Sequence, residues 1–158
     1  MKSLSQKTIL LLVSMFSFFF TSTANAQAFW EIPDPNFKYI AMVRKDPSWG
    51  YAVVYNSTIC EKIGEACAFF RAHEYAHWFH HDLYLHPDEY PTVEEDRADC
   101  WAAKYIKPEQ AEAAAQLLSD SEAIKDLPIY GDPVHRVDLI RKCAKEGGTW
   151  LGGHGYSK

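Results

Sequence analysis

A five-residue motif, His73-Glu74-Tyr75-Ala76-His77, constrains the fold of this chain more than any other feature. Its two histidines are four residues apart, so in an α-helix they lie on one face, about 6 Å apart along the axis. Both imidazoles can then reach one metal ion, and the glutamate between them can reach a water molecule on that ion. The motif therefore predicts a helix from Glu61 to about His81 that carries two metal ligands and a general base.

A second segment, Val93–Ile106, offers a third ligand. If it is a helix, its buried stripe consists of Glu95, two alanines and a tyrosine, and Asp99 follows Glu95 by one turn on the same side. Two unpaired acids on an apolar face would be costly to bury, and a cation removes that cost. We therefore expect Glu95 to bind the metal and Asp99 to hold the other ring nitrogen of a ligand histidine. The alternative is a capping box, in which Thr92 caps the helix and Glu95 reaches back to it.

The two segments together resemble the gluzincin metallopeptidases, particularly the small neutral zinc metallopeptidase type, in which HExxH is followed by a helix carrying ExxAD. The matching pieces are His73–His77 and Glu95–Asp99, and the resemblance covers about residues 49–106. It implies a zincin-like fold and one zinc ion held by His73, His77 and Glu95. It also implies that Glu74 acts as the general base in peptide-bond hydrolysis.

The N-terminal 26 residues have the pattern of a cleaved signal peptide. An apolar run, Ile9–Phe20, is too short to span a bilayer, and Ala24 and Ala26 fit the small-residue rule for cleavage. We therefore expect an exported protein, periplasmic or secreted, without a stable membrane anchor. Removing Lys2 and Lys7 with this segment changes the net charge from −5 to −7. An acidic chain argues against nucleic acid as a partner, and a preference for basic peptides would be compatible with it.

Four cysteines follow the proposed cleavage site, and an even number in an exported chain favours two disulfides. Three pairings are possible. We expect Cys60–Cys67, at the front of the metal helix, and Cys100–Cys143, which would join the Glu95 helix to the last helix. The alternative is a cysteine-based metal site or nucleophile, but the chain has no CxxC spacing.

The remaining pattern predicts a small α+β fold that is mostly helical, with one domain over 27–146 and a Gly-rich flexible tail over 147–158. Tyr39–Val43 and Tyr51–Tyr55 are expected to form an antiparallel β-hairpin before the metal helix. The second strand is a candidate edge strand for pairing with a substrate backbone, and a plain hairpin under the core is the alternative. Three further segments complete the prediction: an extended or irregular lead-in over Gln27–Phe37 and helices over Pro108–Leu118 and Asp132–Lys145.

Metallopeptidases usually also supply a donor that stabilises the oxyanion of the tetrahedral intermediate. His135 is our candidate for this role, with Arg136 and Tyr130 beside it as further possibilities. His80 lies one turn beyond the motif and is expected to be an ordinary, partly buried residue. The rival metzincin pattern fails at His80, where it needs glycine, and at Leu83, where it needs histidine.

These observations predict an exported zinc-dependent endopeptidase that acts on a peptide or protein substrate. Two other classes stay open: a catalytically silent zinc-binding scaffold, and an exported metal-handling protein that uses the histidines from His73 to His86. An amidase that acts on cell-wall peptides is a further possibility within the enzyme class. The number of metal ions per chain and the effect of Glu95 separate the enzyme from the metal-handling protein.

Overall fold

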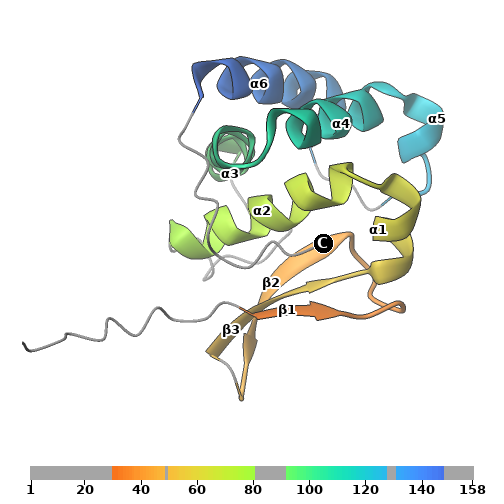
Figure 1. Cartoon of the computed structure of the whole chain (residues 1–158), viewed down its shortest axis with the longest axis vertical. Coiled ribbons are helices and arrows are strands. Elements are labelled where there is room, and N and C mark those ends of the chain that lie inside the picture. The colour runs from red at the N-terminus through yellow and green to blue at the C-terminus, as the bar shows by residue number, and fades with distance from the viewer. Residues whose placement is uncertain (1–29, 49, 81–91, 128–130, 148–158) are drawn as a thin grey trace, which may run out of the picture.

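A computed structural model describes residues 30–48, 50–80, 92–127 and 131–147. In these ranges the chain has six helices and a three-stranded sheet, which confirms the predicted α+β class (Figure 1). The proposed signal peptide and all but the first residue of the predicted tail lie outside the described residues.

The sheet has the strand order β1-β3-β2, with β1 at Trp30–Pro33, β2 at Ala41–Asp46 and β3 at Gly50–Tyr55. The predicted antiparallel hairpin is confirmed, because β2 pairs antiparallel with β3, and Gly50 enters β3 with a positive φ of 84° that glycine readily adopts. β1 pairs parallel with β3 on its other side.

The lead-in is extended over Trp30–Pro33, where it forms β1, but its parallel pairing with β3, some twenty residues later in the chain, was not predicted. One sequence prediction about this sheet is wrong. β3 is the central strand, so Tyr51–Tyr55 cannot act as an edge strand. The edge that lies against the helix with the HExxH motif belongs to β2.

The predicted helix over 61–81 is also wrong in its bounds, because the structure divides this region into α1 (Ser57–Ile63) and α2 (Ala66–Phe79). α1 begins early because the side chain of Asn56 accepts a hydrogen bond from Ile59 N at 2.9 Å. It ends at Gly64, whose φ of 58° lies in the left-handed region.

The other helices follow the predicted segments closely. α4 begins at a proline, and α6 also has proline in its first turn, after Asp132, whose carboxylate accepts from Val134 N at 3.0 Å. A short helix that the sequence analysis did not predict, α5, is capped by Asp120. The helices are α3 at Thr92–Tyr105, α4 at Pro108–Ser119, α5 at Ser121–Ile124 and α6 at Pro133–Glu146.

Helix α2 lies between the sheet and the layer formed by α3, α4 and α6 (Figure 1). The main hydrophobic core fills the space between these helices, and it is centred on Phe69 and Ile140, which are both fully buried. A smaller cluster around Val53 joins the sheet to the opposite side of α2. Helix α2 therefore packs on two sides, which fixes the direction of its motif side chains.

Candidate metal site

The two motif histidines lie on the buried face of α2, as the sequence predicted. His73 and His77 are 6% and 1% exposed, and they share this face with Phe69, Phe70 and Ala76. Their Nε2 atoms are 3.0 Å apart. Both imidazoles therefore present the same ring nitrogen to one small volume.

Glu95 completes this group from the neighbouring helix α3. Its two carboxylate oxygens lie 3.2 Å from His73 Nε2 and 3.4 Å from His77 Nε2. Its contact with both imidazoles gives the carboxylate a role other than the capping box. The Glu95 side chain is 21% exposed, so one side of the group faces solvent.

The geometry of these three side chains fits a tetrahedral metal ion. Ligand atoms about 2.0–2.1 Å from a zinc ion at tetrahedral angles are about 3.3 Å from one another. The three contacts between His73, His77 and Glu95 measure 3.0–3.4 Å. Two imidazoles and a carboxylate are also a donor set that zinc accepts, and they leave a fourth position for water.

Asp99, one turn after Glu95 on α3, is fully buried and holds His73 from its other side. Its Oδ1 lies 2.7 Å from His73 Nδ1. Nδ1 must carry the proton in this contact, because an ionised carboxylate only accepts. The tautomer of His73 is thereby fixed with Nε2 directed toward Glu95 and His77.

Arg136, on α6, holds Asp99 in turn, and this link was not predicted from the sequence. Its Nε and Nη2 atoms each donate to one oxygen of Asp99 at 2.7 Å. The guanidinium also lies 6.0 Å from the ring centre of Phe70. Arg136 lies on the same face of α6 as Ile140 and Cys143, and an arginine on an apolar stripe is the signal that would have found it.

Burial and mutual contacts shift the pKa values of His73, Glu95 and Asp99. Burial disfavours the charged imidazole, but hydrogen bonds to Asp99 and Glu95 outweigh it and raise the pKa of His73 to about 10. Burial also opposes ionisation of the two acids. The histidines outweigh it at Glu95 and Arg136 outweighs it at Asp99, so the pKa of each carboxyl is lowered. The site is thus an ionised cluster that a cation can enter by displacing a proton.

Glu74 lies on α2 beside the two histidines, and the sheet holds its side chain. Its Oε2 accepts a hydrogen bond from the backbone N–H of Val43, on β2, at 2.8 Å. Burial raises the pKa of Glu74 above its usual value, and the neighbouring histidines oppose that rise. A carboxylate with a raised pKa is suited to accepting a proton from water and releasing it again.

Both predicted disulfides are present, and they flank the site. Cys60–Cys67 spans the break between α1 and α2, and Cys100–Cys143 joins α3 to α6. Cys100 is the residue after Asp99, and Cys143 lies two turns after Arg136. The second disulfide therefore joins the same two helices as the contact between Arg136 and Asp99.

The remaining predicted residues are not part of this group. His135, half-exposed at the start of α6, has its Nε2 2.8 Å from Asp96 Oδ1, and its oxyanion role stays a prediction. His80 is partly buried at the end of α2, as expected, and its ring packs against Phe79. Tyr130 lies outside the described residues, as do His81 and His86.

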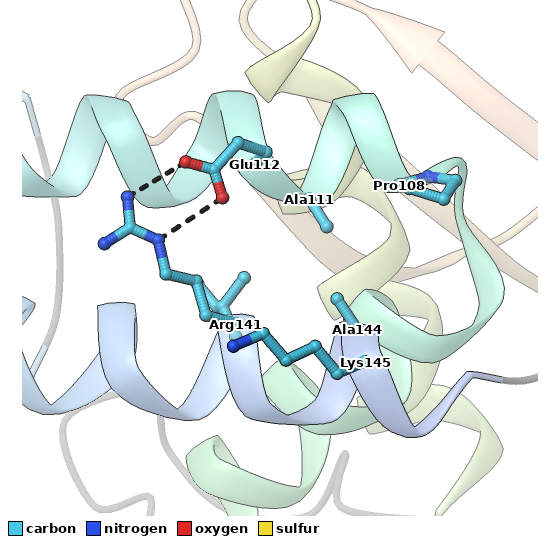
Figure 2. A pocket seen from close by; sticks show the side chains of 7 residues that line it. Pro108, Ala111, Glu112, Arg141, Ala144 and Lys145 are labelled. Carbon is cyan, nitrogen blue, oxygen red and sulfur yellow. Dashed lines mark hydrogen bonds and ion pairs between the residues drawn. The ribbon is translucent and has the colours of Figure 1, made fainter.

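A pocket of about 460 Å³ between α4 and α6 lies apart from these residues (Figure 2). Ala111, Ile140 and Ala144 give it apolar walls, and an ion pair between Glu112 and Arg141 crosses from one helix to the other. It contains none of the candidate metal-binding side chains. A second group of potential ligands among the described residues, centred on Cys100 and Cys143, is formed by sulfurs that the disulfide already uses.

Comparison of the chain with protein-family models, with curated proteins and with solved structures found no match. Among the described residues, no helix is both long and apolar enough to cross a membrane.

Proposed function

We propose that this protein is an exported zinc-dependent metallopeptidase. The observation that carries the proposal is the convergence of His73, His77 and Glu95 within 3.4 Å of one another. The gluzincin resemblance of the two motifs supports the same reading. The two disulfides and the N-terminal pattern of the sequence support export.

In this proposal, the residues of the site have separate roles in binding the ion and in positioning its ligands. His73, His77 and Glu95 bind the ion, while Asp99 and Arg136 hold His73 in the tautomer that can bind. A bound zinc ion supplies Lewis acidity, which activates water and polarises a peptide carbonyl.

Glu74 is the proton carrier in this proposal. It takes the proton of the attacking water and gives it to the leaving amine. The hydrogen bond from Val43 N–H holds the Glu74 carboxylate beside the histidines, so the general base is already positioned before the reaction begins. The solvent-exposed side of Glu95 is the direction from which a peptide can approach.

Metal analysis paired with peptide digestion tests this function. Glu74→Gln should keep one zinc ion per chain and lower kcat/KM for a cleaved peptide by about 10²–10⁴-fold, the usual contribution of an acid–base group. Glu95→Gln should lose both zinc and activity. Asp96→Asn is the matched control for it, because Asp96 is the next residue and pairs with His135 instead.

Three results would contradict the proposal. Undiminished cleavage by Glu74→Gln would exclude the general base, and unchanged zinc content in Glu95→Gln would exclude the third ligand. More than one tightly bound ion per chain, with no cleavage of any peptide in a library, would favour a metal-handling protein.

A further inference from the structure

The outer edge of β2 lies beside the proposed general base. The backbone N–H of Asn56 donates to Ile40 O, so Ile40 and every second residue after it turn their backbone groups toward β3. Val43 belongs to the alternate set, and its N–H indeed points away from β3, to Glu74. The next residue of this outward set is Lys45.

Lys45 is therefore the first outward backbone position of β2 beyond the one that Glu74 occupies. A peptide that adds to this edge finds Val43 N–H already bonded, but it can exchange hydrogen bonds with the N–H and C=O of Lys45. Pairing at Lys45 would hold the peptide about 7 Å along the strand from the catalytic carboxylate.

The Lys45 side chain leaves the sheet on the side where Glu74 lies. Residues two apart on a strand point to the same face, and Val43 packs with Tyr75 and Trp78 of α2. Lys45 thus shares the α2 side of the sheet with the site, yet it is exposed and has no ion pair with any carboxylate among the described residues.

The neighbouring charges of β2 are directed elsewhere. Arg44 points to the opposite face, where its guanidinium lies 6.0 Å from the ring centre of Phe37. The carboxylate of Asp46, on that same face, accepts a hydrogen bond from Ser48 N at 2.8 Å in the turn. On the α2 side of this edge, Lys45 is the next charged residue of β2 beyond the Glu74 carboxylate at Val43.

We propose, as an extension of the peptidase function above, that Lys45 selects peptides with an acidic side chain. A peptide that pairs antiparallel with β2 places a residue directly opposite Lys45, on the same face of the extended sheet. In the peptide sequence, the residue opposite Lys45 precedes the residue opposite Val43 by two positions, so it lies toward the peptide's N-terminus. An Asp or Glu there meets the ammonium group, whereas a Lys or Arg is repelled.

This local charge opposes the charge of the whole molecule. The net charge of −5 taken alone is compatible with basic peptides, because long-range attraction follows the total. At contact distance the nearest group decides, since charges farther than about 8–10 Å are largely screened at physiological salt. We therefore expect a preference for acidic peptides, although the molecule as a whole is negatively charged.

A panel of internally quenched peptides tests the proposal with the zinc-loaded protein. The peptides carry Glu, Gln or Lys at one position at a time on the N-terminal side of the cleaved bond. At one position the Glu peptide should have a kcat/KM up to about fivefold higher than the Gln peptide, the usual range for a direct cross-strand charge pair. The Lys peptide should be poorer than both, and these differences should shrink in 0.5 M NaCl.

Lys45→Glu should invert this order, and Arg44→Glu is the matched control, with the same change of charge on the opposite face. Binding of the same peptides to zinc-loaded Glu74→Gln, measured by fluorescence anisotropy, provides a readout that does not require turnover. Cleavage without a preference for Glu, or a preference that Lys45→Glu leaves unchanged, overturns the inference but leaves the peptidase function standing. If no peptide is cleaved and none binds, both proposals fail.

Discussion

Two arginines of α6, five residues apart, make the same kind of contact in opposite surroundings. Arg136 forms a forked pair with Asp99 in which the two side chains are 7% and 0% exposed. Arg141 forms a forked pair with Glu112 across the α4–α6 pocket, and both side chains are more than 40% exposed (Figure 2). The same chemical contact therefore supports a buried candidate metal site at Arg136 and lies on the exposed surface at Arg141.

The largest effect is expected from Arg136→Ala. Removing one member of a buried pair costs about 3–5 kcal/mol of unfolding free energy. Because His73 still contacts Asp99 at 2.7 Å and is charged in the metal-free protein, we expect a loss at the lower end of that range. Urea denaturation of the metal-free protein measures it. Arg136→Lys, which keeps the charge but loses the fork, should lose less. A loss below about 1 kcal/mol for the alanine variant would place this pair in the class of surface pairs.

The disulfide between the same two helices should come next. Cys100–Cys143 closes a separation of 43 residues and Cys60–Cys67 one of 7, so chain entropy assigns them about 4 and about 2 kcal/mol respectively. Replacing each pair by alanines and comparing urea midpoints tests the order. Replacement of Cys100 and Cys143 should also weaken zinc binding, because α3 and α6 then hold Asp99 less firmly. An equal zinc affinity in both double variants would contradict that link.

The protonation of His73, which contacts Asp99, provides a third test of the buried Arg136–Asp99 pair. The pKa of His73 in the metal-free protein is raised to about 10, from an ordinary 6.5. The charged form therefore stabilises the metal-free fold fully below pH 6.5, and this contribution is lost as the pH rises through 10. Between these values zinc must displace one proton, so its affinity should rise about tenfold per pH unit. Calorimetry in buffers of different ionisation enthalpy measures the number of protons released on zinc binding. A number near zero would contradict this prediction.

The smallest effect is expected from Arg141→Ala, because water replaces its contacts with Glu112. The urea midpoint and the zinc content should both match those of the parent. This variant changes the same residue type on the same helix as Arg136→Ala, and it therefore serves as the control for that prediction. A clear drop in stability would show that the pocket beneath it depends on the pair.

The sequence predicted which side chains of α2 and α3 lie together, whereas their binding of a metal stays a prediction. Both histidines and Glu95 could be found because helical spacing places them on faces that must be buried, and Asp99 was conspicuous as an acid on such a face. Of three possible pairings, the favoured one is confirmed: Cys60–Cys67 was expected as a short loop and Cys100–Cys143 as a link between two helices.

The missed features depend on contacts between distant segments. The parallel pairing of β1 with β3 and the hydrogen bond from Val43 to Glu74 have no local pattern. Arg136 could have been found, because it interrupts an apolar stripe as Asp99 does. Its pairing with Asp99 could not be predicted, because the two residues are 37 positions apart in the sequence.

The position of α2 between two cores has a consequence for how this molecule would fail under stress. His73 is held from the helical layer through Asp99, whereas Glu74, the next residue, is held from the sheet through Val43. If the sheet slips against α2, the Glu74 carboxylate loses its hydrogen bond to Val43, while the contacts among His73, His77 and Glu95 lie on the helical side. For the proposed peptidase, we therefore expect mild denaturant to stop turnover before it releases zinc.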